Sequence, residues 1–421
     1  MLSAAEDIMS KQEGHSKTPI SNSTLDSKTC IETITTRECK TATLGAVLLA
    51  DVVPSLIAKM TLPFFMHRLP HGVRHLMVCV LQAASYIIVA SSNSIAMSLF
   101  GVVCAALGSG IGENAYLSLT AHYSGNAISA WSSGTGGAGI FGSLAYAGLT
   151  EPHLLGLSPR TTLLVMLIIP VLFYITNYTV LVPSPTIYRA NISRPQTWII
   201  PSVSKKHIIT TTDEKDAIGR HAWASSAESI AVKENDLHQS NTTATLTTQQ
   251  RLRLVLPLLK YMIPISVVYF AEYLINQGLT QFLVFDCANS FSFSPHSQYR
   301  WYQVVYQLGV FISRSSINFI ELPFWGLLLL PVLQLANTTF FLFESIYYFI
   351  PHIAIAFGVI LFEGFFGGAS YVNTFHRIHK DAEPRVREYS LAVASLADAV
   401  GIVIAGFTTI PVHNFVCNLN S

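Results

Sequence analysis

The sequence has few charged side chains for its length. Only 12% of its 421 residues are Asp, Glu, Lys or Arg, whereas soluble domains carry about 25%. Of these 49 side chains, 33 lie in three segments, 1–40, 183–253 and 376–388, which leaves 16 for the rest of the chain. The formal net charge of +1 provides no basic excess for nucleic acid. The composition therefore excludes a water-soluble enzyme, a nucleic-acid-binding protein and a disordered tail protein, and it indicates a polytopic membrane protein.

Catalytic and metal-binding patterns are also lacking. The six cysteines and fourteen histidines show no metal-type spacing. No Ser/His/Asp, HExxH or paired-aspartate arrangement falls at a usable helical spacing, and Asp51 and Asp398 are expected to lie alone. We therefore expect no enzyme activity, no metal and no cofactor.

The cysteines allow one disulfide to be considered. Cys30 and Cys39 share the N-terminal tail, where a bond between them is one alternative and two free thiols are the other. Cys79 and Cys104 lie in apolar runs and are interpreted as small packing residues. Four residues follow Cys417, and they do not form a prenylation box.

Long apolar runs are what the sequence does contain. A transmembrane helix needs about 20 predominantly apolar residues. The runs of this length are 41–63, 73–91, 95–119, 126–149, 160–182, 254–278, 298–317, 322–344, 346–374 and 389–413. The run at 298–317 is the weakest because it carries two arginines and two glutamines. We therefore predict an all-α polytopic membrane protein with about ten transmembrane helices.

Lys and Arg residues in the short loops indicate the orientation. Those near 68–74 and 376–388 fall on one side of the membrane, which the positive-inside rule makes cytosolic. The tails 1–40 and 414–421 then face the lumen or the exterior. Asn22 begins an Asn-Ser-Thr sequon in the first of these tails and is the predicted glycosylation site.

One polar segment divides the runs into two equal groups. Segment 183–253 is rich in Ser, Thr, Gln and Asn, and it cannot bury enough apolar surface to fold alone. We interpret it as a flexible cytosolic linker between an N-terminal bundle, 41–182, and a C-terminal bundle, 254–413. Two bundles joined in this way are typical of major-facilitator-type transporters. A weak internal repeat, Gly112–Ser118 against Gly367–Asn373, supports this layout.

A glycine motif lies in the fourth run. Gly134–Gly139 matches GxGxxG, but the dinucleotide fingerprint requires a strand before it and an acidic residue about 20 positions later. Here the motif is enclosed in an apolar run. We interpret it as a set of small residues that lets two membrane helices pack closely.

Ionisable and polar residues inside the runs are the candidate functional residues, because burying a charge in a bilayer is costly. Tyr269, Glu272 and Asn276 lie at i, i+3 and i+7 on one helix face, and Glu113 and Tyr116 repeat the first spacing. The predicted cavity set is Glu113, Tyr116, Tyr269, Glu272, Asn276, Gln277, Arg314, Glu363, Tyr371 and Asn373. A polar solute, with a coupling proton on a carboxylate, is the predicted cargo. An interhelical hydrogen-bond network without transport remains the alternative.

Asp51 and Lys59 are two further charged residues of the first run. A buried ion pair between them, purely structural, is one interpretation. A functional role in a cavity is the other.

Several segments carry a family resemblance. They are Leu48–Asp51, Trp131–Gly139, Tyr269–Gly278, Tyr299–Gln303, Arg314–Ser316 and Tyr371–His376. Together they resemble the battenin family of lysosomal membrane proteins. The resemblance implies a facilitator-type fold in late endosomal and lysosomal membranes and export of glycerophosphodiesters, the headgroup remnants of phospholipid breakdown. Links of the family to lysosomal pH are a further implication.

The resemblance also implies a difference at the N-terminus. Family members have another hydrophobic helix ahead of the segment that begins here at Met1. With that helix counted, the third, sixth and ninth runs become the fourth, seventh and tenth helices of the fold. These are helices that line the cavity in facilitator-type transporters.

Three functions follow from these observations. The first is glycerophosphodiester export, for which the phosphate needs a cation, with Arg314 and Lys59 as candidates. The second is transport of basic amino acids such as arginine, bound by the acidic residues. The third is a non-transporting scaffold that recruits trafficking partners through 183–253. The predicted partners are thus a small polar solute, protons, the lipid bilayer and trafficking factors, and no nucleic acid.

Overall fold

The computed structural model describes residues 30–32, 34, 44–65, 69–123, 126–182, 198, 253–384 and 386–420. Asn22, Cys39 and nearly all of segment 183–253 lie outside this part of the chain. The predicted sequon and the linker therefore stay predictions, and so does the side of the membrane assigned to the two tails. All regular secondary structure in the described part is helical, which confirms the all-α prediction.

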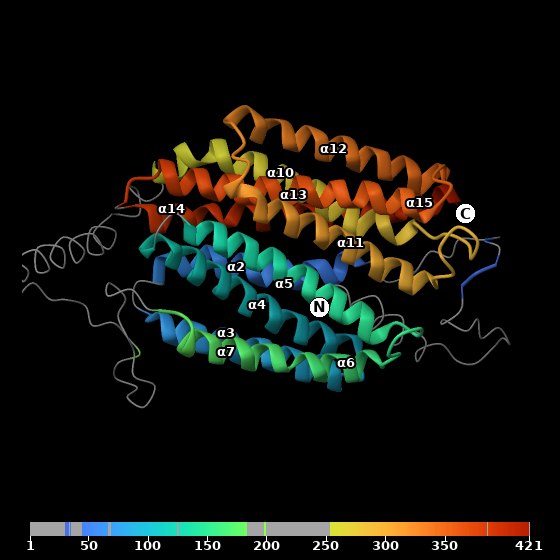
Figure 1. Cartoon of the computed structure of the whole chain (residues 1–421), viewed down its shortest axis with the longest axis horizontal. Helices are drawn as coiled ribbons and strands as arrows, with labels where there is room; N and C mark the ends of the chain where they lie inside the picture. Colours follow the sequence, from blue (N-terminus) through green and yellow to red (C-terminus); the bar gives the residue numbers. More distant parts are fainter. Residues whose placement is uncertain are drawn as a thin grey trace, which may run out of the picture.

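The N-terminal half consists of helices that run roughly along the long axis of the molecule (Figure 1). They are α2 Leu44–Phe65, α3 His71–Ser91, α4 Ile95–Leu119, α5 Asn126–Thr150, α6 Pro159–Met166 and α7 Ile168–Thr179. Within this half α4 packs against both α2 and α3, and α3 also packs against α6 and α7. The side chain of Ser94 accepts a hydrogen bond from the backbone N–H of Met97 (3.3 Å) and thereby begins α4 where the sequence predicts a helix.

The C-terminal half lies beside the first. Its helices are α10 Leu259–Leu274, α11 Pro295–Ser315, α12 Phe324–Tyr347, α13 Ile353–Asp381, α14 Arg387–Ala394 and α15 Leu396–Asn420. A π-helical turn, Ile275–Leu279, continues α10 directly. Such turns inside helices occur often at functional sites, and this one contains two of the predicted cavity residues, Asn276 and Gln277.

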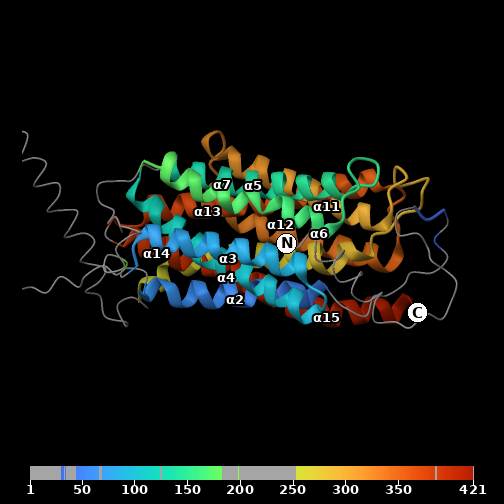
Figure 2. The ribbon, with the colours of Figure 1, turned by 90° about the horizontal axis from the view of Figure 1, so that it is seen from below.

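The two halves meet along several helix pairs. Helix α2 packs against α15, α5 packs against α11 and α13, and α4 packs against α14. Figure 1 shows the helices of residues 44–179 on one side and those of residues 259–420 on the other, and in Figure 2, seen from below, helices of the first group such as α3 and α7 lie in front. The two-bundle arrangement predicted from the sequence is therefore present.

Seven helical segments of the described chain are long and apolar enough to cross a membrane. They are His71–Ser91, Ile95–His122, Pro159–Thr179, Arg253–Phe282, Phe324–Tyr347, Ile353–Asp381 and Arg387–Leu419. Helices α2, α5 and α11 lie alongside them with 22, 25 and 21 residues but are not among the seven. The count of about ten membrane crossings therefore stays a prediction.

The start of the ninth run differs from its prediction by seven residues. The apolar run begins at 346, but α13 begins at Ile353. Tyr348 ends α12 with a left-handed backbone (φ 52°), and His352 caps α13 by accepting the backbone N–H of Ala354 (3.1 Å). The turn between the two helices is itself apolar, so hydrophobicity alone cannot locate it.

The disulfide that was one alternative for Cys30 and Cys39 is not the one that Cys30 forms. Cys30 is bonded to Cys287, in the loop between α10 and α11, with 5.2 Å between their Cα atoms. The backbone N–H of Cys287 also donates to the carbonyl of Ile31 (2.8 Å), so the tail segment lies along this loop. The signal was available, because Cys287 follows the sixth predicted run and falls on the same predicted side of the membrane as the tail.

Glycines set the distance between neighbouring helices. Gly364 in α13 lies against α11, where a Cβ would meet the carbonyl oxygen of Tyr306 and lie 3.1 Å from the Cα of Gly309. A Cβ on Gly358, in the same helix, would meet nothing within 4 Å. The close contact at Gly364 therefore leaves no space for a larger residue, whereas there is space for one at Gly358.

We expect Gly364→Ala to destabilise the protein by about 1–3 kcal/mol, because α11 and α13 must separate to admit the methyl group. Gly358→Ala is the matched control and should be neutral or slightly stabilising, since alanine favours a helix over glycine. Thermal unfolding of the purified protein in detergent measures both changes. Equal stability of the two variants would contradict the close contact.

Candidate functional site

A cavity of about 370 Å³ lies between the two halves. Helices α2, α3, α4, α5 and α7 line it from the N-terminal half, and α10, α11, α13 and α15 line it from the C-terminal half. Its volume is at the lower end of the 300–1,000 Å³ typical of small-molecule pockets. The ionisable Asp, Glu, Lys and Arg residues on its wall are Asp51, Lys59, Glu113, Arg314 and Asp398.

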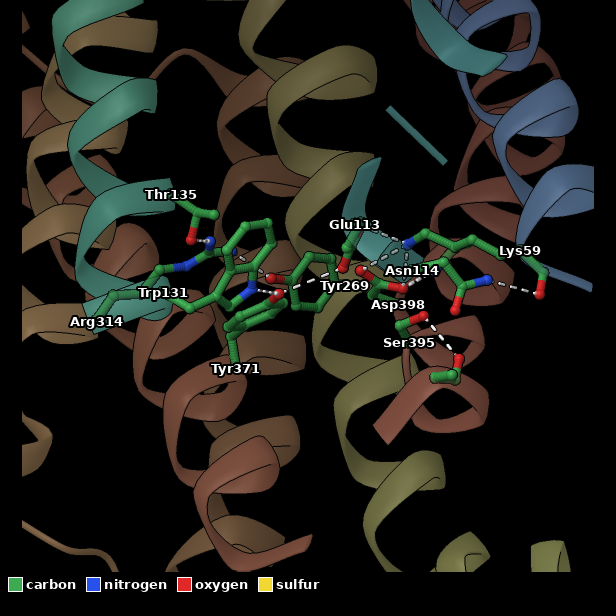
Figure 3. Close-up of polar contacts among 12 residues, drawn as sticks. Lys59, Glu113, Asn114, Trp131, Thr135, Tyr269, Arg314, Tyr371, Ser395 and Asp398 are labelled. Atoms are coloured by element: carbon green, nitrogen blue, oxygen red, sulfur yellow. Dashed lines mark hydrogen bonds and ion pairs between the residues drawn. The ribbon is translucent and has the colours of Figure 1, made fainter. Parts of the chain in front are cut away.

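Lys59 joins three helices on one side of the cavity (Figure 3). Its ammonium group lies 2.7 Å from Oε2 of Glu113 in α4 and 3.0 Å from Oδ1 of Asp398 in α15. Asn114 donates to the backbone carbonyl of Lys59 (3.2 Å). Only 3% of Lys59 is exposed. One buried cation therefore contacts carboxylates from both halves of the molecule.

Lys59 does not form the ion pair with Asp51 that was one of the two interpretations of these residues. The two residues are eight positions apart in α2, which separates them by about 12 Å along the helix. Lys59 pairs with Glu113 and Asp398 instead. The expectation that Asp398 lies alone is wrong for the same reason, whereas Asp51 has no ion pair with any residue of the described chain.

Arg314 occupies the other side of the cavity (Figure 3). Its Nη1 donates to the hydroxyl of Thr135 in α5 and its Nη2 to the hydroxyl of Tyr269 in α10, both at 2.8 Å. The guanidinium carbon lies 3.9 Å from the ring centre of Tyr371. Among the described residues no carboxylate lies within ion-pair distance of Arg314. The described groups that contact its guanidinium, two hydroxyls and one aromatic ring, are therefore neutral.

The glycine motif of α5 makes room for this arginine. A Cβ on Gly136 would lie 3.4 Å from both Cβ and Cδ of Arg314 and 3.0 Å from the Cα of Phe311. The motif is therefore a packing motif, as predicted. It also allows the stem of Arg314 to lie against α5.

Aromatic side chains connect the two charged groups. The hydroxyl of Tyr371 donates to Oε1 of Glu113 (3.3 Å) and accepts from the indole N–H of Trp131 (3.2 Å). Tyr116 stacks on Trp131 with 5.8 Å between ring centres and shares a hydrogen bond with His75. Since Tyr371 also stacks on Arg314, it is in contact with both sides of the cavity.

Four predicted cavity residues form a separate buried cluster in the C-terminal half. Glu272 accepts a hydrogen bond from the hydroxyl of Tyr306 in α11. Asn276 donates to Oε1 of Glu363 in α13 (2.6 Å), and Tyr299 donates to the side chain of Gln277 (3.2 Å). These residues are at most 2% exposed and do not line the cavity.

Asn373 also lies away from the cavity. Its side-chain oxygen accepts the backbone N–H of Leu322 (2.8 Å), in the segment that leads into α12. Of the predicted set, the structure thus brings Glu113, Tyr116, Tyr269, Arg314 and Tyr371 to the cavity.

Sequence reasoning missed several residues of the cavity. Trp131 lies three residues before the glycine motif, Thr135 is its second residue, and Tyr273 lies one turn after Tyr269. The spacing of Tyr269 and Tyr273 at i and i+4 could have identified the latter, and their rings stack with centres 6.2 Å apart. Nothing in the local sequence pattern distinguishes Thr135 from other small residues.

Comparisons with known proteins identify the family. A profile of the CLN3 protein family matches residues 1–419. Battenin from the dog, Canis lupus familiaris, is 40% identical over 422 residues, which cover 100% of this chain and 88% of battenin. Protein btn-1 from Neurospora crassa is 35% identical over 386 residues, covering 89% of this chain and 81% of btn-1.

A solved structure shares the fold. The crystal structure of the human organic anion transporter MFSD10 (TETRAN) matches with a TM-score of 0.51 and 14% identity, over 90% of this chain and 84% of that one. At this identity the likeness shows the fold alone, and it confirms the predicted major-facilitator fold. The profile match and the identity to battenin span the whole chain, so this multi-pass membrane protein belongs to the CLN3 protein family.

Proposed function

We propose that the protein is a transporter, not an enzyme, and that it exports glycerophosphodiesters from the lysosome. The observation that carries this proposal is Arg314, a cation on the cavity wall whose partners in the described chain are neutral. The family and the fold support a membrane transporter of a small solute. The name battenin supports the lysosomal location.

Of the two cations on the wall, Arg314 suits the phosphodiester better. Lys59 already contacts two carboxylates, so an anion there would meet net negative charge. Arg314 has five N–H donors, of which two donate to the hydroxyls of Thr135 and Tyr269. Its Nε has no partner within the described structure. Free donors in a planar fork match two phosphate oxygens.

The size of the cavity supports a headgroup-sized solute. About 370 Å³ is enough for a compact polar molecule, but two acyl chains would not fit. A glycerophosphodiester is what remains of a phospholipid after both chains are removed. MFSD10, of the same fold, is described as an organic anion transporter, and an anionic cargo for this chain agrees with that.

The proposal is tested by measuring solute flux. The protein is reconstituted in liposomes loaded with labelled glycerophosphocholine. Liposomes that are loaded in the same way but contain no protein are the control. We expect protein-dependent efflux that unlabelled glycerophosphodiesters inhibit and equimolar arginine does not. Inhibition by arginine alone would instead support the basic amino-acid transporter, an alternative that the three cavity carboxylates favour.

We further propose that Glu272 carries the coupling proton. It is 1% exposed, and the one hydrogen-bond partner of its carboxylate in the described structure is the neutral hydroxyl of Tyr306. Glu272 lies three residues after Tyr269, which binds Arg314. Protonation of Glu272 and binding of an anion at Arg314 would therefore both change contacts of the same turn of α10.

Glu272→Gln should remove proton-driven accumulation and leave exchange of solute intact, because glutamine has a similar shape but cannot titrate. The measurement compares uptake under a tenfold proton gradient with exchange at equal pH. Tyr306→Phe, which removes the hydrogen bond and keeps the carboxylate, is the control and should retain the response to the gradient. A variant Glu272→Gln that still accumulates solute would exclude this carboxylate as the proton carrier.

A further inference from the structure

Two carboxylates lie buried together in the C-terminal half, away from the cavity. Glu272 in α10 is 1% exposed and Glu363 in α13 is 0% exposed. A Cβ on Gly367 would meet Oε2 of Glu272, so this carboxylate lies against the backbone of α13 one turn after Glu363. The two carboxylates also act on each other electrostatically. They therefore form one buried acidic pair between α10 and α13.

Each carboxylate of this pair uses one oxygen and leaves the other without a partner. Oε1 of Glu272 accepts a hydrogen bond from Tyr306, and Oε1 of Glu363 accepts one from Asn276 at 2.6 Å. The Oε2 atoms of both residues are buried and have no hydrogen-bond partner in the described structure. An ionised carboxylate can only accept, so a proton on one Oε2 would provide the donor that the other Oε2 lacks.

The amide of Asn276, in the π-helical turn after α10, has no donor left for this purpose. One of its two N–H groups donates to Oε1 of Glu363 and the other to the backbone carbonyl of Glu272 (3.2 Å). Its Oδ1 accepts from Nε2 of Gln303 in α11 (3.4 Å), which agrees with this orientation of the amide. A donor for the Oε2 atoms therefore has to be a proton on the pair itself.

No cation of the described chain forms an ion pair with either carboxylate. Arg314 in α11 attracts Glu272 from beyond ion-pair distance, and Asp398 in α15 repels it. The other titratable groups that act on Glu272 or are acted on by it are neutral phenols, Tyr269, Tyr273 and Tyr306. Two like charges buried together are costly, so one carboxylate of the pair keeps a proton.

The surroundings favour Glu363 as the residue that keeps it. Glu272 receives a hydrogen bond from Tyr306 and the attraction of Arg314, and both favour its charged form. Glu363 receives its hydrogen bond from Asn276, and the charge that acts on it is that of Glu272, which is of like sign. With one proton bound, the negative charge therefore lies on Glu272.

We propose that Glu272 and Glu363 form one proton-binding site. Glu363 keeps its proton through the transport cycle and donates it in a hydrogen bond to the carboxylate of Glu272, whereas Glu272 gains and loses the coupling proton. This inference rests on the proposed function, in which Glu272 carries that proton. It gives Glu363 a positioning role, because its O–H stabilises the charged form of Glu272 and so allows the proton to leave. The pair then alternates between one negative charge and none.

The test is the pH dependence of transport by the full chain in liposomes. A proton gradient drives uptake of labelled glycerophosphocholine, and the pH of half-maximal uptake is measured on the side that supplies protons. Glu363→Gln keeps a neutral donor, so its half-maximal pH should equal that of the wild type. Glu363→Met removes the donor, so Glu272 should bind its proton more tightly. Its half-maximal pH should rise by about one to two pH units, the effect of one hydrogen bond to a charged group.

Three results would overturn the inference. A lower half-maximal pH in Glu363→Gln would mean that Glu363 is charged in the wild type, because glutamine then removes a like charge. The same half-maximal pH in the wild type and both variants, even with slower transport, would mean that Glu363 only supports the fold. Uptake that follows a Na+ gradient instead of a proton gradient would mean that the pair binds a metal cation.

A second measurement separates this inference from the proposed function. Infrared spectroscopy at alkaline pH detects the carbonyl stretch of a protonated carboxylic acid. We expect a band in the wild type that Glu363→Gln lacks and Glu272→Gln retains, and its absence from the wild type would overturn the inference even if transport is coupled to protons. A wild type that shows the band but carries no glycerophosphodiester, or carries it without response to a proton gradient, would overturn the proposed function and leave the proton on Glu363 established.

Discussion

Replacing Arg314 by glutamine should reduce transport of glycerophosphodiesters by at least about 30-fold, because a buried charged partner contributes about 2–5 kcal/mol to a bound ion. Glutamine retains some hydrogen bonding to Thr135 and Tyr269, so the helices that meet there need not separate. The loss should therefore appear in solute flux, with little change in thermal stability. Efflux from liposomes loaded with labelled glycerophosphocholine measures it.

Two controls make this result specific. Arg314→Lys keeps the charge but loses the planar fork, so it should transport at an intermediate rate. Lys380→Gln removes a cation whose side chain is 64% exposed and lies next to Glu321, far from the cavity wall, and should transport like the wild type. Full activity of Arg314→Gln would mean that the phosphate binds elsewhere.

Replacing Lys59 by methionine should have the largest effect on stability. It leaves Glu113 and Asp398 without the cation that contacts both of them, in a site where Lys59 is 3% exposed. Breaking a buried pair from one side costs about 3–5 kcal/mol. We expect a large decrease in the thermal stability of the detergent-solubilised protein and a lower yield in membranes.

The compensating variant identifies the cause. Lys59→Met combined with Glu113→Gln and Asp398→Asn removes all three charges and leaves no unpaired carboxylate. It should recover most of the lost stability, because replacing a complete buried ion group by neutral residues is often nearly neutral. If the triple variant were as unstable as Lys59→Met alone, the lysine would act through packing of its alkyl chain.

The fold was largely predictable because it depends on local signals. Apolar runs of about 20 residues marked the helices, and a cap such as Ser94 gave α4 the bounds predicted for it. Errors arose where apolar residues form turns, as at Tyr348, because hydrophobicity does not distinguish a turn from a helix there. The polar stretch between the runs indicated the division into halves.

The site was predictable only in part because its contacts join distant segments. The spacing of Tyr269 and Glu272 identified one face of α10, but these two residues have different neighbours. Which of them reaches the cavity depends on α11 and α13, which a helical period cannot show. Lys59 and Asp398 are 339 positions apart, and no local pattern connects them.

The bond between Cys30 and Cys287 encloses the N-terminal half, together with the segment 183–253, in one covalent loop. A single cut of the backbone anywhere in that segment would open the loop without dividing the molecule. The two halves are thus connected covalently twice, once by the peptide backbone through 183–253 and once by the disulfide. Under oxidising conditions they remain a single covalent molecule even when the backbone in that segment is cleaved.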